Sequence, residues 1–220
     1  MVVQDMPFPM THLIIARNIL NATSQIKDPA QFLLGSIAPD AVHFRPDFES
    51  DMKKVSHLVV GDERWGWVTD NDGWRENVLT FLDLMKDEDP DFILGYCAHI
   101  LADIKHNIEI WTPFRAKHEE EVKRGYSALH KEAVEVDFEI YRTCPDRQKI
   151  WELLERARPI DIPGIMEARD IKKARAHLLY KQYEGRKPVD VSRFKHVTVK
   201  TMVDLVEGAW KEIARELGLT

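Results

Sequence analysis

The sequence predicts an all-α protein, and three observations support this fold class. Apolar residues recur at helical spacing along most of the 220 residues, prolines stand between these periodic segments, and the alternation typical of a half-buried strand is nearly absent. With 44% hydrophobic and 31% charged residues, the chain can bury a substantial core. We therefore expect a single multi-helix domain over residues 1–220, in which helices between 146 and 217 complete the bundle.

The first third of the chain is expected to hold two helices followed by a long irregular stretch. Thr11 is a typical N-cap residue and predicts a helix over 11–22. Asp28, followed by a proline, predicts a short second helix that ends at Gly35. Residues 41–73 are expected to be mostly irregular.

Two tryptophans, Trp65 and Trp67, lie in that irregular stretch among turn formers and acidic residues. Long loops of this kind often carry function. We nevertheless favour the simpler interpretation that both rings pin the loop to the core. The rest of the chain is expected to be helical over residues 74–86, 91–110, 115–124, 126–142, 146–157, 164–184 and 198–217.

Charge and targeting patterns restrict the possible functions. The net charge of −6 and the pI near 5.9 argue against general nucleic-acid binding. They do not exclude a phosphate-binding enzyme, because metal ions can supply positive charge locally. Cys97 and Cys144 are too few for a disulfide framework. The first residues lack a signal-peptide pattern and no apolar run is long enough to span a membrane, so we expect a cytoplasmic protein.

The strongest candidate site is the array His99-x-x-x-Asp103-x-x-His106 inside an apolar helical pattern. At helical spacing Asp103 lies roughly 40° from His99, and His106 lies roughly 20° from it on the other side. The three side chains therefore share one face, which also carries Gly95. Two imidazoles and a carboxylate on one face suit a divalent transition metal. A hydrogen-bonded His–Asp pair in a helical core is the alternative.

Other histidines extend this candidate site. His12 stands at the start of the first expected helix, and His57 begins a short apolar run after a polar loop. His130 lies on the expected helix 126–142, where Asp137 shares its face within about 20°. Buried imidazoles are costly unless they pair or bind metal. Three further histidines have charged neighbours and are expected at the surface: His118, His177 and His196.

The order of these motifs resembles the bacterial zinc-dependent phospholipase C family, which is related to fungal single-strand-specific zinc nucleases. The resemblance covers roughly residues 7–140. It implies an all-helical domain that holds up to three zinc ions and cleaves phosphate esters. The motifs that carry it are Thr11-His12-Leu13, Gly35-Ser36-Ile37-Ala38-Pro39-Asp40, Ser56-His57-Leu58, Gly95-Tyr96, His99-x-x-x-Asp103 and His130.

The resemblance also implies individual roles. A first metal would be held by His57, His99, Asp103 and Asp40, with Asp103 bridging toward another ion. Asp40 would also be the candidate general base. By the same resemblance, His12 would bind the metal nearest the N-terminus, and a further metal would use His130 on the next helix.

Several positions depart from the family pattern. Secreted members use a processed N-terminal tryptophan as a ligand, whereas this chain starts with Met1. The later helix has Val134 where the family has a glutamate; Asp137 is expected to replace it, because Glu135 points about 140° away from His130. Glu109 stands where the family has another histidine, and His106 is expected to fill that role.

These features together predict a metal-dependent hydrolase of phosphate esters that uses zinc, one to three ions, or another divalent transition metal. The substrate would be a phosphate-ester small molecule or a lipid headgroup. Lys53 or Lys54 is a candidate phosphate contact, and we take Lys54; a solvated pair of loop lysines is the alternative. The oligomeric state does not follow from the sequence.

Three rival function classes fit the sequence less well. An HD-type phosphohydrolase is disfavoured because no histidine is followed directly by an aspartate. A di-iron carboxylate bundle is disfavoured because the chain has no Glu-x-x-His motif. The non-enzyme alternative is a degenerate family member that keeps a structural metal and binds a partner or small ligand.

Overall fold

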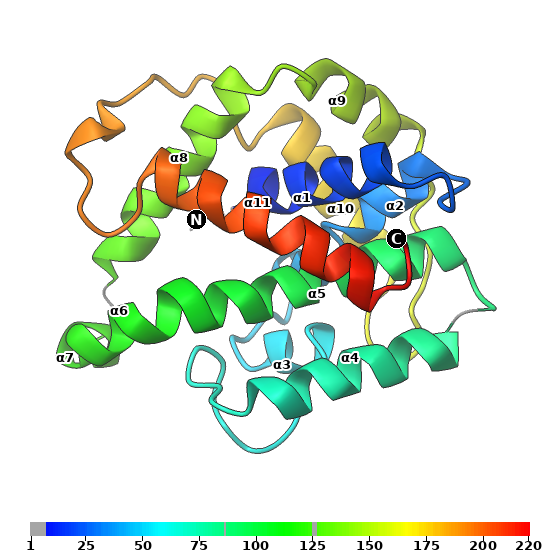
Figure 1. Ribbon diagram of the computed structural model, residues 1–220, viewed down its shortest axis with the longest axis horizontal. Helices are drawn as coiled ribbons and strands as arrows, with labels where there is room; N and C mark the ends of the chain where they lie inside the picture. Colours follow the sequence, from blue (N-terminus) through cyan, green and yellow to red (C-terminus); the bar gives the residue numbers. More distant parts are fainter. Residues whose placement is uncertain (1–7, 86, 125–126) are drawn as a thin grey trace.

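The computed structural model describes residues 8–85, 87–124 and 127–220, and in these ranges it is built from helices with no strand (Figure 1). The predicted all-α fold class is confirmed. The α-helices are α1 (Pro9–Ala22), α2 (Pro29–Gly35), α3 (Met52–Ser56), α4 (Asn71–Met85), α5 (Pro90–His106), α6 (Thr112–Lys117), α7 (Glu119–Lys123), α8 (Ala128–Thr143), α9 (Arg147–Arg156), α10 (Ala168–Tyr180) and α11 (Val199–Glu216). Shorter helical turns are η1 (Pro39–Phe44), η2 (Asn107–Trp111) and η3 (Val191–Arg193).

The beginnings of the first two helices differ in how they are capped. Asp28 caps α2 as predicted, because its carboxylate accepts hydrogen bonds from the next turn. Thr11 is not the N-cap of α1, which begins at Pro9 after Phe8 in a left-handed conformation (φ 51°). The proline suits the first helical position, where no N–H is needed. Helix α1 therefore begins two residues before the expected start at Thr11, and its N-cap is Phe8.

Helices α2 and α5 pack closely because a glycine on each meets the backbone of the other. A Cβ on Gly95 would lie 2.0 Å from the carbonyl oxygen of Phe32, and one on Gly35 would lie 2.1 Å from that of Phe92. No larger residue fits either position without separating the helices. This close approach brings the chain after α2 to the middle of α5, where the candidate ligand His99 lies.

The stretch expected to be irregular contains two short helical pieces, which corrects the prediction for residues 41–73. η1 carries Asp40, and α3 ends immediately before His57. Both pieces are short, five or six residues, and so carry too few turns to show a helical period in the sequence.

Helix α5 also continues further than expected. The chain passes from His106 into the π-helical turn η2 and on into α6 (Figure 1). Pro113 falls in the first turn of α6, where its missing N–H is tolerated, so this proline does not separate the helices. The helix expected at 115–124 is instead divided at His118 into α6 and α7.

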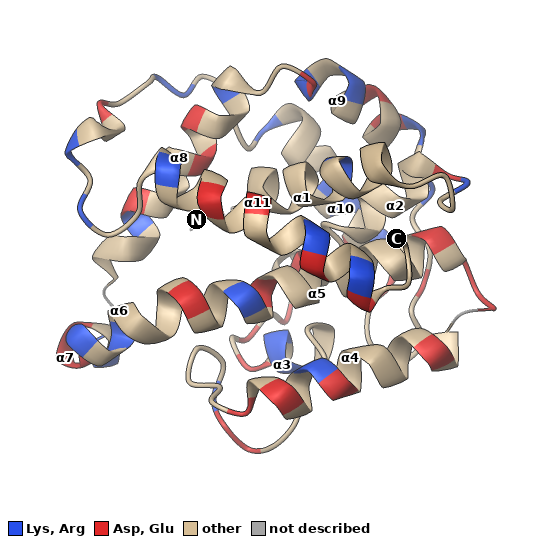
Figure 2. Cartoon of the chain, viewed as in Figure 1, with Lys and Arg blue, Asp and Glu red and all other residues tan. Residues whose placement is uncertain are grey.

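The helices after residue 146 pack on the N-terminal helices rather than apart from them. α11 lies against α1 and α5, α9 lies against α2, and α10 lies against η1 (Figure 1). Acidic and basic residues are interspersed along α11 and α4 (Figure 2). Ion pairs tie α11 to its neighbours: Lys105 to Glu212 at 2.6 Å and Arg75 to Glu216 at 3.3 Å. Among the described residues, no helix is long and apolar enough to cross a membrane.

Candidate metal centre

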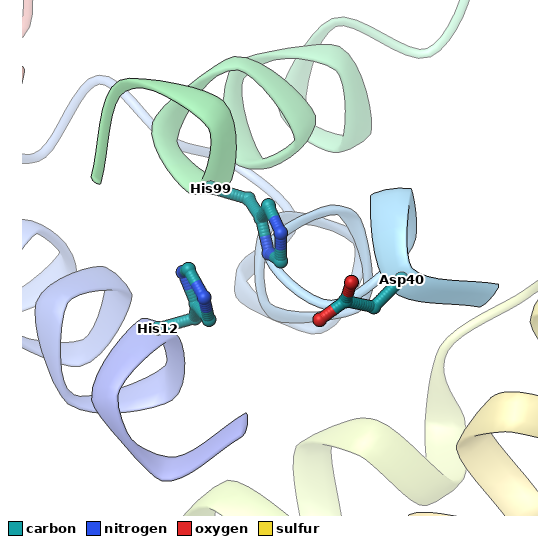
Figure 3. A group of neighbouring side chains, drawn as sticks. All are labelled: His12, Asp40 and His99. Atoms are coloured by element: carbon teal, nitrogen blue, oxygen red, sulfur yellow. The ribbon is translucent and has the colours of Figure 1, made fainter. Parts of the chain in front are cut away.

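Five predicted ligand residues meet at one place, although they come from four separate segments. They form two overlapping groups, one of His12, Asp40 and His99 (Figure 3), the other of His57, His99 and Asp103. In each group the candidate ligand atoms lie within 4.8 Å of one another. The helical spacing placed His99 beside Asp103, but the fold brings the other three residues to them.

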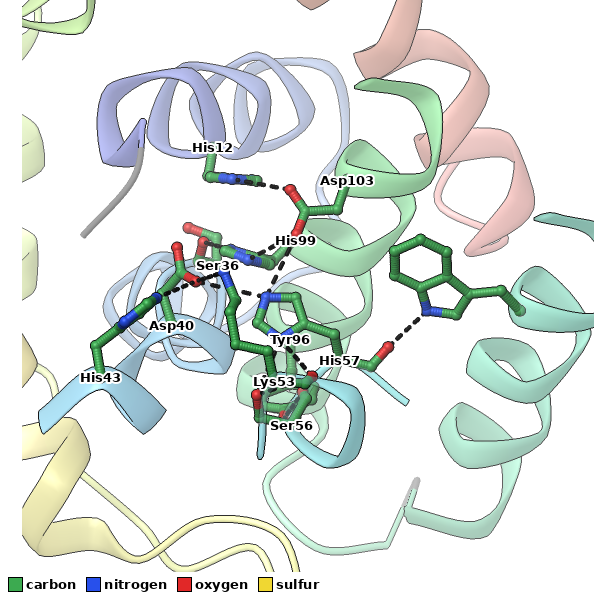
Figure 4. Close-up of polar contacts among 11 residues, drawn as sticks. His12, Ser36, Asp40, His43, Lys53, Ser56, His57, Tyr96, His99 and Asp103 are labelled. Atoms are coloured by element: carbon green, nitrogen blue, oxygen red, sulfur yellow. Dashed lines mark hydrogen bonds and ion pairs between the residues drawn. The ribbon is translucent and has the colours of Figure 1, made fainter. Parts of the chain in front are cut away.

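The contacts within this cluster join imidazole nitrogens to carboxylate oxygens (Figure 4). The Nε2 atom of His57 lies 3.3 Å from Asp103 Oδ2 and 3.5 Å from Asp40 Oδ1. His99 Nε2 lies 3.6 Å from Asp103 Oδ2. His12 Nε2 lies 3.4 Å from Asp103 Oδ1, and its ring stacks on that of His99 at 3.7 Å between centroids.

The outer nitrogens of the two central histidines are already used. His99 Nδ1–H donates to the carbonyl oxygen of Ser36 at 2.8 Å. His57 Nδ1 lies 3.1 Å from the carbonyl oxygen of Lys53 and 2.9 Å from the hydroxyl of Ser56. A carbonyl only accepts, so both rings carry their proton on Nδ1. Their Nε2 lone pairs therefore point into the cluster, where neither has a hydrogen-bond partner among the described residues.

Burial keeps these imidazoles neutral. It lowers the pKa of His99 to about 3 and that of His57 to about 4, and the pKa of His12 is likewise well below its usual value. Burial acts to raise the pKa of Asp40, but the ammonium of Lys53 together with His57 and His99 outweighs burial, so the pKa of this carboxyl stays well below its usual value and the group is ionised.

The neutral imidazole lone pairs face the ionised carboxylate of Asp40 and repel it unless a cation lies between them. Burial raises the pKa of Asp103 to about 7, so this second carboxyl gives up its proton when a cation binds beside it. Nitrogen and oxygen donors of this kind fit Zn²⁺, which binds neutral imidazole and carboxylate. With its Nδ1 committed to Ser36, His99 has one free nitrogen and can serve one ion. Through His99, therefore, only one of the two overlapping groups can hold an ion.

The backbone that presents His57 is held by side chains from α4 and α5. Tyr96 Oη donates to the carbonyl of Ser56, and Trp74 Nε1 donates to that of His57 at 2.6 Å. Asn77 Nδ2 donates to the carbonyl of Leu58 at 2.8 Å. Leu58 has a left-handed conformation (φ 55°), which costs free energy for a non-glycine residue and is maintained by such contacts.

The two adjacent lysines have opposite environments, which corrects the choice of Lys54. Lys54 donates to the carbonyl of Gly61 at 3.0 Å, outside the cavity. Lys53 is buried, 6% exposed, and its ammonium lies 2.8 Å from Asp40 Oδ1. One residue shifts a side chain by about 100° on a helix. Because α3 is so short, the sequence did not show which lysine faces inward.

His43 belongs to the site and was missed as a ligand candidate. Its Nε2 lies 3.7 Å from Asp40 Oδ1, three residues earlier in η1. Burial lowers its pKa to about 4. The Asp40-x-x-His43 spacing would have indicated this proximity, had residues 39–44 been predicted as helical.

His106 and His130 are not in the ligand groups of the five central residues, and both rings pack against Phe8. Their ring centroids are 5.8 Å and 5.5 Å from that of Phe8. Burial lowers the pKa of His106 to about 4, and His130 adds to this lowering. Both line the same cavity as the cluster, but no carboxylate joins them in a ligand group among the described residues.

Asp137 is buried as its helical phase predicted, but it is not brought to His130 as a ligand. One oxygen accepts the N–H of Met10 at 3.0 Å and the other accepts the hydroxyl of Tyr183 at 2.6 Å. This corrects its expected role: the carboxylate anchors the first turn of α1. Glu135 pairs with Arg186 at 2.9 Å and lies away from the cluster as expected.

The three histidines expected at the surface are half-buried, because they pack on Phe114 and Phe44. They are His118, His177 and His196. None of the three lines the cavity. Met1 lies outside the described residues.

Three residues of the cluster, His12, Asp40 and Asp103, line a cavity of about 480 Å³ and form what we call its polar floor. Its walls are largely aromatic, and Trp65 and Trp67 are among them, so these rings do more than pin a loop. Trp65 packs on the His57 ring at 4.7 Å, and Trp67 lies under the guanidinium of Arg115 at 4.8 Å. The other aromatic wall residues are Phe8, Phe48, Trp74 and Trp111.

The profile of the family described as zinc dependent phospholipase C matches residues 11–148, more than half of the chain. The chain belongs to this family. Searches of curated proteins and of solved structures found no significant match. The matched zinc-dependent phospholipase C region contains every residue of the cluster, whereas Tyr183 and α11, which support it, lie beyond that region.

Proposed function

We propose that this member of the zinc-dependent phospholipase C family is a zinc-dependent hydrolase of phosphate esters. One observation carries the proposal: the Nε2 lone pairs of His57 and His99 face the carboxylates of Asp40 and Asp103 in a buried cluster. A bound cation removes the repulsion among these groups. The proposed ligands of that ion are His57, His99, Asp103 and Asp40.

Bound zinc polarises a phosphoryl oxygen and lowers the pKa of water to about 7, which supplies a nucleophile at neutral pH. The protein's own groups accept protons and orient the ligand imidazoles. Asp40 is the proposed general base, because its ionised carboxylate borders both the ligand cluster and the cavity. The Ser36 and Lys53 carbonyls keep the imidazoles of His99 and His57 in the tautomer that leaves Nε2 free.

Further ions are proposed for the residues around this site. His12 is the proposed ligand of a second ion that shares the carboxylate of Asp103. His106 and His130 are proposed for a third, with the remaining ligands supplied by water or substrate. The proposed total is therefore one to three ions per chain.

The cavity supports a substrate with a phosphate group and an apolar or cationic portion. Its polar floor suits the phosphate, and its aromatic walls suit an apolar group or the face of a cation. We propose a small phosphate ester or a lipid headgroup as the substrate class, acted on by a cytoplasmic protein.

The test combines a metal count with turnover. Purified protein is analysed for metal per chain, then assayed on an aryl phosphodiester, an aryl phosphomonoester and short-chain phospholipids, before and after chelation and metal restoration. Asp40→Asn is expected to reduce turnover at least about 100-fold, since it removes a ligand charge and the proposed base. His118→Ala, which is away from the cavity, is the control.

A second candidate function is supported by Val134 and by the hydrogen-bonded state of Asp137, which together leave the later helix without a ligand carboxylate. In this alternative the metal is structural and the cavity binds a ligand without turnover. Metal that raises the melting temperature while the whole substrate panel stays inert would favour it over the hydrolase.

A further inference from the structure

Lys53 has a position unusual for a lysine, because its ammonium is buried on the wall of the cavity. The residue is 6% exposed and is the second residue of α3 (Figure 4). Lysine is seldom buried unless it is paired, so its retention there needs a partner. Asp40, at 2.8 Å, is that partner on one side.

The known contacts of this ammonium do not use all of its donors. One N–H points to Asp40 Oδ1, and the ring of Trp65 lies 4.6 Å from the nitrogen on another side. An ammonium has three N–H donors. Within the described residues no second hydrogen-bond acceptor of this ammonium is found, and Lys53 and Asp40 both line the cavity.

The charges that line the cavity indicate what the remaining N–H donors of Lys53 would bind. Lys53 is the one lysine or arginine among the described residues that line the cavity. A metal ion at the cluster and the ammonium would both border Asp40, so two positive charges would flank the same region of the floor. Such a pair attracts an anion placed between them.

We propose that Lys53 is a phosphate-binding residue, which donates a charge-assisted hydrogen bond to a non-bridging oxygen of the bound phosphate group. This inference rests on the proposed function, because it places the phosphate beside the metal ligands. It assigns the phosphate contact to Lys53 and not to its neighbour Lys54, which is outside the cavity.

The experiment measures binding of inorganic phosphate to the zinc-loaded full-length protein by calorimetry, together with zinc content. Lys53→Gln is expected to weaken phosphate binding by about 10-fold or more at unchanged zinc content, since a charge-assisted hydrogen bond is lost. Lys54→Gln is the matched control and should bind phosphate as the wild type does. Equal phosphate affinity in Lys53→Gln and the wild type would overturn the inference.

Two further outcomes separate this inference from the proposed function. If no phosphoester is hydrolysed but phosphate affinity still depends on Lys53, the assignment stands and the hydrolase proposal fails. If phosphoesters are hydrolysed and Lys53→Gln leaves the phosphate affinity unchanged, the hydrolase proposal stands and the assignment to Lys53 fails. Should Lys53→Gln fail to fold, a crystal structure of the zinc-loaded wild type with phosphate decides: a phosphate oxygen at hydrogen-bond distance from Lys53 Nζ supports the assignment, and its absence refutes it.

Discussion

The carbonyl oxygen of Ser36 accepts the Nδ1–H of His99 at 2.8 Å, and this hydrogen bond connects the end of α2 to the middle of α5. It fixes the ring orientation and the tautomer of His99, so that Nε2 is directed at Asp103. The two helices approach this closely because Gly35 and Gly95 lack side chains at the crossing. The geometry of the proposed metal site therefore depends on residues that are not among its proposed ligands.

Gly95→Ala is expected to destabilise the protein by at least about 3 kcal/mol, because its Cβ would lie 2.0 Å from the carbonyl of Phe32 and force the helices apart. Gly208→Ala, also within a helix, is the control. A Cβ there meets only the Lys105 side chain at 3.6 Å, so this substitution should stabilise by about 0.5–1 kcal/mol. Urea unfolding compares the two; equal effects would contradict the packing argument.

Trp74→Phe is expected to cost about 1–3 kcal/mol and to weaken zinc binding. The substitution removes the donor to the buried carbonyl of His57, next to the left-handed Leu58, so the segment that presents His57 loosens. Trp210→Phe is the control, since its Nε1 contacts Glu207 near the surface. Thermal unfolding and competition with a zinc chelator give both readouts. Unchanged zinc affinity in Trp74→Phe would show that this carbonyl does not position His57.

Asp137 is expected to make stability fall as the pH rises from about 4 to 7. Burial raises its pKa to about 7 in the folded protein against a usual value of 3.8, so the folded state binds the extra proton across this range. The slope is at most about 1.4 kcal/mol per pH unit. Asp137→Asn, which can still accept from Met10 and donate to Tyr183, should lack this contribution. Urea unfolding at several pH values across this range measures the stability of both proteins, and the exposed Asp87→Asn is the control. Parallel curves of stability against pH for the wild type and Asp137→Asn would refute the prediction.

Zinc is expected to raise the melting temperature of chelated protein, because it binds the folded cluster in preference to the unfolded chain. Free zinc at 100 times its dissociation constant adds about 2.7 kcal/mol to the stability. His99→Ala should lose most of this zinc-dependent increment, whatever its own stability. His196→Ala should keep it, since His196 packs on Phe114 outside the cavity. Differential scanning calorimetry with and without zinc measures this rise in melting temperature. If His99→Ala showed the full zinc-dependent rise, the assigned cluster would be refuted.

Local sequence patterns were sufficient for much of the fold and for part of the site. The long helices, the Asp28 cap and the shared face of His99 and Asp103 were predictable, because each depends on residues within a few positions of one another. The family resemblance added the proximity of His12, His57 and Asp40 to them. The short helices η1 and α3 were not predictable by period, and this is why His43 was missed and Lys54 was taken in place of Lys53.

The sequence by itself determined that this chain is helical and which residues carry metal-binding chemistry, since periodicity and residue type are local properties. Only the tertiary structure decided which partner each polar group meets. Asp137 has the inward phase of a ligand, yet Met10 and Tyr183 occupy its oxygens. Lys53 faces the cavity and Lys54 does not. Such outcomes depend on contacts between segments far apart in the chain, and spacing along one helix contains no information about what packs against it.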